Sequence, residues 1–134
     1  MTVRFVVLIS GNGSNLQAIL DACASGELSA TVVSVISNKA DAYGLVRAKN
    51  VGVEAIHFPK QENESRCDYD ARLADYVSTC LPDYVILVGW MRILSSSFLA
   101  SFPNRVINLH PALPGIFPAL TLSNALSKPI NAGR

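Results

Sequence analysis

The sequence contains no block of like charge, and this absence excludes two classes of partner. Its 134 residues carry 11 Lys and Arg against 10 Asp and Glu, so the formal net charge is +1 with neutral histidines. A nucleic-acid-binding surface needs clustered positive charge, and an acidic interaction tail needs a run of carboxylates. We therefore expect no nucleic-acid partner, and a small anionic ligand would have to be held by a local site.

Cysteine and long hydrophobic runs are also scarce. The three cysteines, Cys23, Cys67 and Cys80, are widely spaced and form neither a CxxC pair nor a Cys/His cluster. This pattern favours reduced thiols in a cytoplasmic protein over a disulfide framework or a metal site. The apolar run after Arg4 spans only five residues, which is too short for a signal peptide or a membrane span. We therefore expect no metal and no membrane partner.

The sequence does contain enough apolar side chains for one globular core, because 50% of its residues are hydrophobic and 16% are charged. Apolar runs of strand length alternate with segments of helical periodicity. This alternation predicts an α/β fold with a Rossmann-like, mostly parallel sheet flanked by helices. The predicted strands are Val3 to Ile9, Thr31 to Ser37, Val53 to His57, Tyr84 to Val88 and Arg105 to Leu109, and the predicted helices are Ser14 to Ser25, Tyr43 to Lys49, Ser65 to Cys80 and Ser95 to Ala100.

The character of the sequence changes after Pro118. Residues 119–134 show no clear strand and only a weak helical stripe, which Pro129 interrupts. We therefore predict a domain over residues 1–118 that is incomplete at its C-terminus, followed by an atypical tail over residues 119–134.

The most informative stretch begins at Val106, where a buried-strand run ends in Asn108, Leu109, His110 and a proline-rich loop. Ligands of open α/β sheets bind beyond the carboxyl ends of the strands. Side chains two residues apart on a strand point to the same face. Asn108 and His110 are therefore candidates to hold a carbonyl group and to move a proton.

A second candidate site follows the first predicted strand. Ser10-Gly11-Asn12-Gly13-Ser14-Asn15 joins this strand to a helix, and the free N–H groups of a helix N-terminus suit a phosphate. A tight turn without a ligand and a dinucleotide-binding turn are the alternatives. The dinucleotide pattern is weakened because Leu16 stands at its third glycine position, while Asn38 and Lys39 stand where an acidic residue is expected.

Other polar residues are interpreted as structural. His57 has no partner motif. Ser65 is a predicted helix cap, with Asp68 three residues on, close to a capping box. We expect surface carboxylates or caps at Asp41, Asp68, Asp70 and Asp75 and core positions at Tyr69, Leu73 and Tyr76.

Four motifs together resemble the phosphoribosylglycinamide formyltransferase family. They are SGNGSNLQAI (residues 10–19), SNKADA (37–42), GWMRILS (89–95) and NLHPAL (108–113), in the family's order and spacing over roughly residues 3–118. The resemblance implies the formyltransferase fold. It also implies transfer of a formyl group, through a tetrahedral intermediate, from the co-substrate 10-formyltetrahydrofolate to the amine of glycinamide ribonucleotide in purine biosynthesis.

The resemblance also implies roles for individual residues. Gly13, Ser14 and Asn15 would hold the phosphate of the ribonucleotide. Asn108 would bind the developing oxyanion, and His110 would stabilise the intermediate and shuttle protons. The implied folate-binding residues are Arg66, Met91, Arg92, Ile93, Leu94 and Asn108.

The chain departs from the family's pattern after Pro118. The family has a catalytic Asp on a loop downstream of the His-Pro segment, and the sequence ends before it. Codons exist for this tail such that restoring one guanine after Pro118 makes it read GTHAIERAFEAYQRGA, which resembles the family's pattern. We therefore hypothesise a one-base deletion near Pro118, natural or introduced, and self-association through the face that the truncation would expose.

Several functions remain alternatives at this point. The chain could be an inactive fragment that binds the ribonucleotide phosphate. It could also be related to methionyl-tRNA formyltransferase or formyltetrahydrofolate hydrolase, which share the Asn-x-His-Pro core, although the glycine-rich loop near the start favours glycinamide ribonucleotide. A nicotinamide-binding oxidoreductase domain is a further alternative.

Overall fold

The computed structural model describes residues 2–11, 14–90 and 94–109. Strands and helices alternate along this part of the chain, and each begins and ends within one residue of its predicted bounds. The strands are β1 (Val3–Ile9), β2 (Ala30–Ser37), β3 (Glu54–His57), β4 (Tyr84–Val88) and β5 (Val106–Leu109), and the helices are α1 (Ser14–Ser25), α2 (Tyr43–Asn50), α3 (Arg66–Thr79) and α4 (Ser96–Ser101). The predicted Rossmann-like α/β fold is confirmed.

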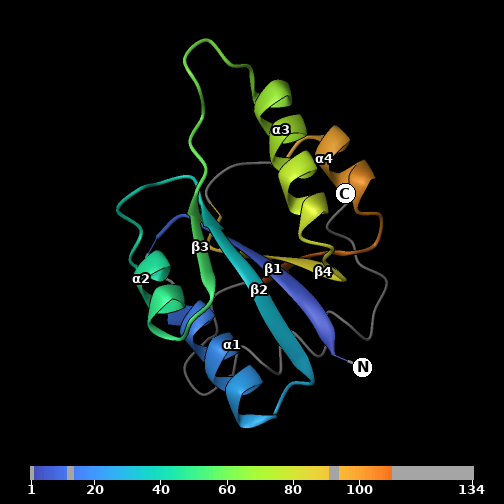
Figure 1. Cartoon of the computed structure of the whole chain (residues 1–134). Coiled ribbons are helices and arrows are strands. Elements are labelled where there is room, and N and C mark those ends of the chain that lie inside the picture. The colour runs from blue at the N-terminus through green and yellow to red at the C-terminus, as the bar shows by residue number, and fades with distance from the viewer. Residues whose placement is uncertain (1, 12–13, 91–93, 110–134) are drawn as a thin grey trace.

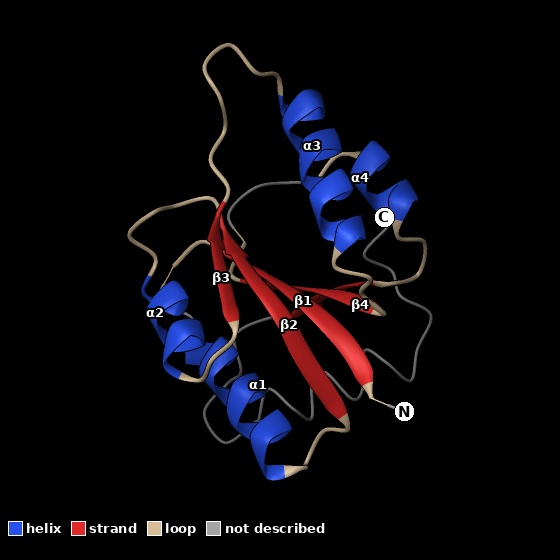
Figure 2. Cartoon of the chain, in the orientation of Figure 1, coloured by secondary structure: helices blue, strands red, loops and turns tan. Residues whose placement is uncertain are grey.

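The five strands form one parallel sheet in the order β3-β2-β1-β4-β5. Helices α1 and α2 lie on one side of this sheet, and α3 and α4 lie on the other (Figure 1). Figure 2 shows the same three layers coloured by type of element. Because the chain turns from β2 and β3 on one side of β1 to β4 and β5 on the other, the sheet has a topological switch point between β1 and β4.

The core lies in two layers, one on each face of the sheet. Phe5, Val7 and Ile9 of β1 pack into the cluster beneath α1 and α2. Val6 and Leu8 of the same strand pack into the cluster beneath α3 and α4. Both faces are covered, so residues 5–9 of β1 form a continuous apolar run without a polar alternation.

The register aligns the last residues of all five strands in one row. Ile9 pairs with Ser37 of β2 and with Val88 of β4. Ser37 pairs in turn with His57 of β3, and Val88 pairs with Leu109 of β5. The loops that leave β1, β4 and β5 therefore start from neighbouring positions at one edge of the sheet.

Helix ends follow the sequence signals. The Ser65 hydroxyl oxygen accepts a hydrogen bond from the N–H of Asp68 at 3.0 Å and so caps α3. Ser95 caps α4 in the same way. After α1, Gly26 has a φ of 85°, which a residue without a Cβ adopts at little cost.

No helix in the described ranges is long and apolar enough to cross a membrane.

Candidate functional site

The candidate site lies at the carboxyl-terminal ends of the strands. Some of the predicted site residues lie outside the described part of the chain. Gly13, Met91, Arg92, Ile93 and His110 belong to the segments 12–13, 91–93 and 110–134. The described residues include both ends of the loop after β1, both ends of the loop after β4, and the end of β5.

The loop after β1 is tied to the end of β2 by a short hydrogen bond. Ser10 is buried, and its hydroxyl donates to Oδ1 of Asn38 at 2.7 Å. The position that would hold an acidic residue in a dinucleotide-binding fold is thus occupied by an amide that fixes the loop. This contact is evidence against a dinucleotide-binding turn at the end of β1.

The same loop is held by the first turn of α2. The N–H of Gly44 donates to the carbonyl oxygen of Gly11 at 3.2 Å. A Cβ at position 44 would collide with Cδ1 of Ile9 and would lie 3.4 Å from that carbonyl oxygen. A side chain at position 44 would therefore force the buried end of the Ile9 side chain to move, because α2 packs closely on the end of β1.

Helix α1 begins at Ser14, directly after this loop, with half-buried Asn15 in its first turn. The first turn contains no acidic residue. The first N–H groups of a helix have no partner within the helix, and the helix dipole adds partial positive charge there. This N-terminus can therefore accept an anion, since no carboxylate of the first turn competes for it.

At the end of β5, burial changes within three residues. Val106 and Ile107 are each 1% exposed, whereas Asn108 is exposed. Alternation along the strand places Asn108 on the same face as Val106, which packs beneath α3 and α4. The Asn108 amide is thus available to a ligand on the α3 and α4 side of the edge.

The loop after β4 begins with a turn that needs glycine. Gly89 has a φ of 67°, in the left-handed region that L side chains rarely adopt. Trp90 follows and packs against the apolar cluster under α3 and α4, as does Leu94 beyond the segment 91–93. Within the described chain, the buried Nε1 of Trp90 has no hydrogen-bond partner.

Arg66, the first residue of α3, is exposed and leaves its cation open to solvent. The loop before this helix is held by Arg72, whose guanidinium makes two 2.9 Å hydrogen bonds to the carboxylate of Glu64. The same guanidinium lies 4.4 Å from the centre of the Phe58 ring. The hydrogen bonds from Arg72 lower the pKa of Glu64 from its ordinary 4.5 to about 2.

The structure corrects one prediction on α3. Asp70 is not a surface carboxylate, because it is 0% exposed, and its Oδ2 accepts a hydrogen bond from the N–H of Ser95 at 2.6 Å. The sequence carried a signal for this burial: Asp70 lies on a helical stripe completed by Leu73, Ala74 and Val77. Asp70 and Gly44 are the two residues near the site that the sequence analysis missed.

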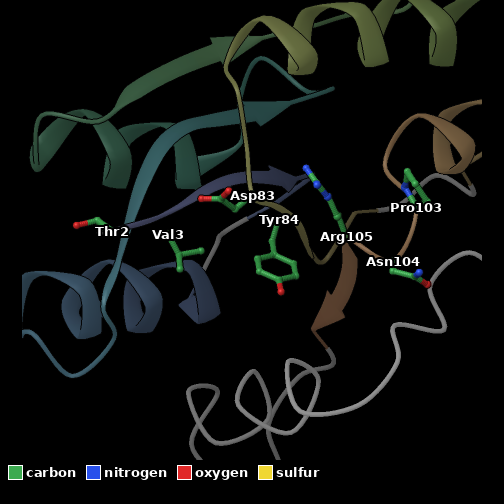
Figure 3. A pocket seen from close by; sticks show the side chains of 7 residues that line it. All are labelled: Thr2, Val3, Asp83, Tyr84, Pro103, Asn104 and Arg105. Atoms are coloured by element: carbon green, nitrogen blue, oxygen red, sulfur yellow. The ribbon is translucent and has the colours of Figure 1, made fainter.

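A hollow of about 400 Å³ lies at the amino-terminal ends of the strands, opposite the candidate site. Figure 3 shows the side chains that line it, which come from the first residues of β1 and β4 and from the segments just before β1, β4 and β5. None of the predicted site residues in the described ranges lines this hollow. Across the described ranges there is also no group of three or more His, Cys, Asp or Glu side chains that could hold a metal ion.

These features define a Rossmann-like domain: a parallel sheet with a helix N-terminus at its switch point, and an exposed amide two strands away at the same carboxyl ends of the strands. The comparisons with known proteins specify the family. The model of the formyl transferase family matches residues 3–130. The chain therefore belongs to the formyl transferase family.

Several relatives that resemble the chain are named phosphoribosylglycinamide formyltransferase. The phosphoribosylglycinamide formyltransferase of Escherichia coli (strain K12) is 46% identical over 118 residues, which are 88% of this chain and 56% of that protein. The phosphoribosylglycinamide formyltransferase of Dictyostelium discoideum is 44% identical over 131 residues, and the match covers 88% of this chain and 64% of that protein.

Among solved structures, glycinamide ribonucleotide transformylase 1 from Symbiobacterium toebii is 46% identical and superposes with a TM-score of 0.79. The match covers 94% of this chain and 60% of that one. The chain thus spans less than two thirds of the length of these relatives.

Proposed function

We propose that the chain binds glycinamide ribonucleotide and 10-formyltetrahydrofolate and transfers the formyl group to the amine of the ribonucleotide. One observation carries this proposal. The loops that the resemblance assigns to the phosphate, the folate and the reacting groups leave β1, β4 and β5 from neighbouring positions of one row, at Ile9, Val88 and Leu109. The names of the relatives support the same substrates.

The phosphate of the ribonucleotide binds at the start of α1. Backbone N–H groups of Gly13, Ser14 and Asn15 donate to its oxygens, and the helix dipole favours the negative charge. The ties from Asn38 to Ser10 and from Gly44 to Gly11 support this role, because they fix the loop before the ligand arrives.

Formyl transfer needs a donor for the oxyanion and a carrier for the proton. The amine attacks the formyl carbon, a C–N bond forms, and the carbonyl oxygen gains negative charge. The Asn108 amide donates a hydrogen bond to this oxygen. As the bond from the carbon to N10 of the folate breaks, His110 passes the proton released by the amine to N10.

The folate lies along α3 and the loop after β4. The exposed cation of Arg66 suits the carboxylates of the folate tail, and half-buried Leu94 offers an apolar wall to the pterin ring. Met91, Arg92 and Ile93 contribute backbone groups to the ring edge. The residues present thus fit a folate as co-substrate.

A second candidate function is binding without turnover. The chain spans 56% of the Escherichia coli relative, so part of that enzyme has no counterpart among these residues. In this case the loop after β1 binds the ribonucleotide phosphate, and no formyl group is transferred.

The experiment that separates the two candidates measures the initial rate of formyl transfer together with ribonucleotide binding by calorimetry. Asn108→Ala is expected to lower the rate by ~10²–10³, because it removes one oxyanion donor. Asn108→Asp keeps the shape of the side chain but loses the donor, so it should be equally slow. Asn50→Ala, at an exposed amide at the end of α2, should keep the wild-type rate.

The outcomes discriminate clearly. If Asn108→Ala transfers the formyl group at the wild-type rate, the proposed mechanism is rejected. Ribonucleotide binding without any turnover establishes the second candidate, and the absence of both binding and turnover rejects the two together.

A further inference from the structure

Asp70 makes a contact between two elements that surround the proposed folate site. Its carboxylate is completely buried, and Oδ2 accepts the N–H of Ser95 at 2.6 Å, across 25 residues of sequence. Its second oxygen, Oδ1, is also buried and has no hydrogen-bond partner among the described residues. A buried carboxylate is costly compared with an apolar side chain of similar size. Stability alone therefore gives no reason for an Asp at this position.

The bond to Ser95 fixes the point at which the loop after β4 enters α4. Ser95 is the N-cap of α4, and its hydroxyl oxygen accepts the N–H of Phe98 at 3.4 Å. Leu94, directly before it, packs on the apolar cluster that contains Leu73 of α3. The backbone at Ser95 is thus held from α3 by the Asp70 carboxylate, and the Leu94 side chain packs on an apolar cluster to which α3 contributes.

Arg66 lies four residues before Asp70 on the same helix. Residues at this spacing lie on the same face of a helix, one turn apart. The helix that carries Asp70 toward Ser95 therefore also carries the exposed Arg66, one turn before Asp70. The Asp70 contact thus links the helix that carries Arg66 to the backbone that directly follows Leu94, and both are folate-binding residues of the proposed function.

We propose that Asp70 is a positioning residue for folate: its buried carboxylate holds Ser95 and so sets the distance between Leu94 and Arg66. This inference rests on the proposed function. It predicts that the loss of the acceptor weakens the binding of the folate and leaves the ribonucleotide phosphate, bound at the start of α1, unaffected.

The test compares Asp70→Ala, Asp70→Asn and the control Asp75→Ala, which removes an exposed carboxylate of the same helix. Affinities for 10-formyltetrahydrofolate, kept under argon, and for glycinamide ribonucleotide are measured by calorimetry on each folded variant. Asp70→Ala should weaken folate binding by at least about tenfold, because a hydrogen bond to a charged group is lost. Its affinity for the ribonucleotide should stay within about twofold.

Asp70→Asn keeps an oxygen for the N–H of Ser95 and should recover most of the folate affinity. Equal weakening of both ligands in Asp70→Ala would show a merely structural role and overturn the proposal. Wild-type folate affinity in a folded Asp70→Ala variant would overturn it as well.

A readout without folate separates this proposal from the proposed function. Amide hydrogen exchange at Ser95 should be faster in Asp70→Ala than in Asp75→Ala, whereas exchange in β1 should be the same in both. If the wild type does not bind folate, the proposed function fails. Unchanged exchange at Ser95 refutes the positioning contact itself.

Discussion

A single ion pair holds the loop that leads from β3 to α3. The carboxylate of Glu64 accepts two hydrogen bonds from Arg72 and one from the N–H of Gln61 at 2.8 Å. The Arg72 guanidinium also donates to the carbonyl oxygen of Pro59 at 2.8 Å and lies over the rings of Phe58 and Tyr69. The loop is therefore closed at both ends by one side chain, immediately before Arg66.

This ion pair predicts a pH dependence of stability. The pKa of Glu64 is lowered from 4.5 to about 2 in the folded chain. A lowered pKa means that the pair contributes stability above pH 4.5 and that this contribution is lost as the pH falls from 4.5 toward 2. Urea unfolding at pH 6 and pH 3 should show a smaller pH-dependent loss in Glu64→Gln than in the wild type.

Glu62→Gln is the matched control for this prediction, since Glu62 is exposed and lies in the same loop. The control should lose as much stability between the two pH values as the wild type does. An equal loss in Glu64→Gln would contradict the role given to the ion pair.

At the scale of elements, α2 packs closely on the end of β1 and on the start of the loop that follows it. Buried Gly44 lies against Ile9, Gly11 and Leu16, which stand on both sides of the segment 12–13. The loop that we propose to bind phosphate is thus shaped by a helix that itself supplies none of the proposed phosphate contacts.

Gly44→Ala is therefore expected to destabilise the chain by about 1–3 kcal/mol, the usual cost of overpacking. Ile9→Val deletes the Cδ1 atom that the new Cβ would meet. The double variant should be more stable than the sum of the two single effects predicts, as measured by urea unfolding in a double-mutant cycle.

Ile36→Val is the control for this cycle, because Ile36 is equally buried but packs in the other cluster. It should combine additively with Gly44→Ala. If Gly44→Ala and Ile9→Val also combined additively, the close approach of α2 to Ile9 would not be the cause of the destabilisation by Gly44→Ala.

At the scale of the whole molecule, a ligand that binds only the folded chain must raise its stability. Glycinamide ribonucleotide at a concentration one hundred times its Kd should add about 2.7 kcal/mol to the free energy of unfolding. The midpoint of thermal unfolding should rise with the ligand concentration. The corresponding riboside without its phosphate is the control and should raise the midpoint much less, because the start of α1 binds the phosphate.

A rise of the same size with the riboside would contradict a phosphate site at the start of α1. No rise with either compound would contradict ribonucleotide binding by the folded chain, whichever of the two candidate functions holds.

The sequence predicted the order and the bounds of the elements because those depend on neighbouring residues. The β-branched run of β1, the Ser65 cap and Gly26 after α1 each act within one turn or one strand, so periodicity and capping rules identify them. The amide at Asn108 was found for the same reason, since it interrupts an apolar run at the end of a strand.

By itself, then, the sequence determined the alternation of strands and helices, the family motifs and the candidate site residues. Only the tertiary structure decided which residues support that site. The hydrogen bond of Asp70 depends on Ser95, and the lack of room for a side chain at position 44 depends on Ile9. These partners lie on different elements, and no local pattern encodes the contact, because it forms only when the helices pack on the sheet.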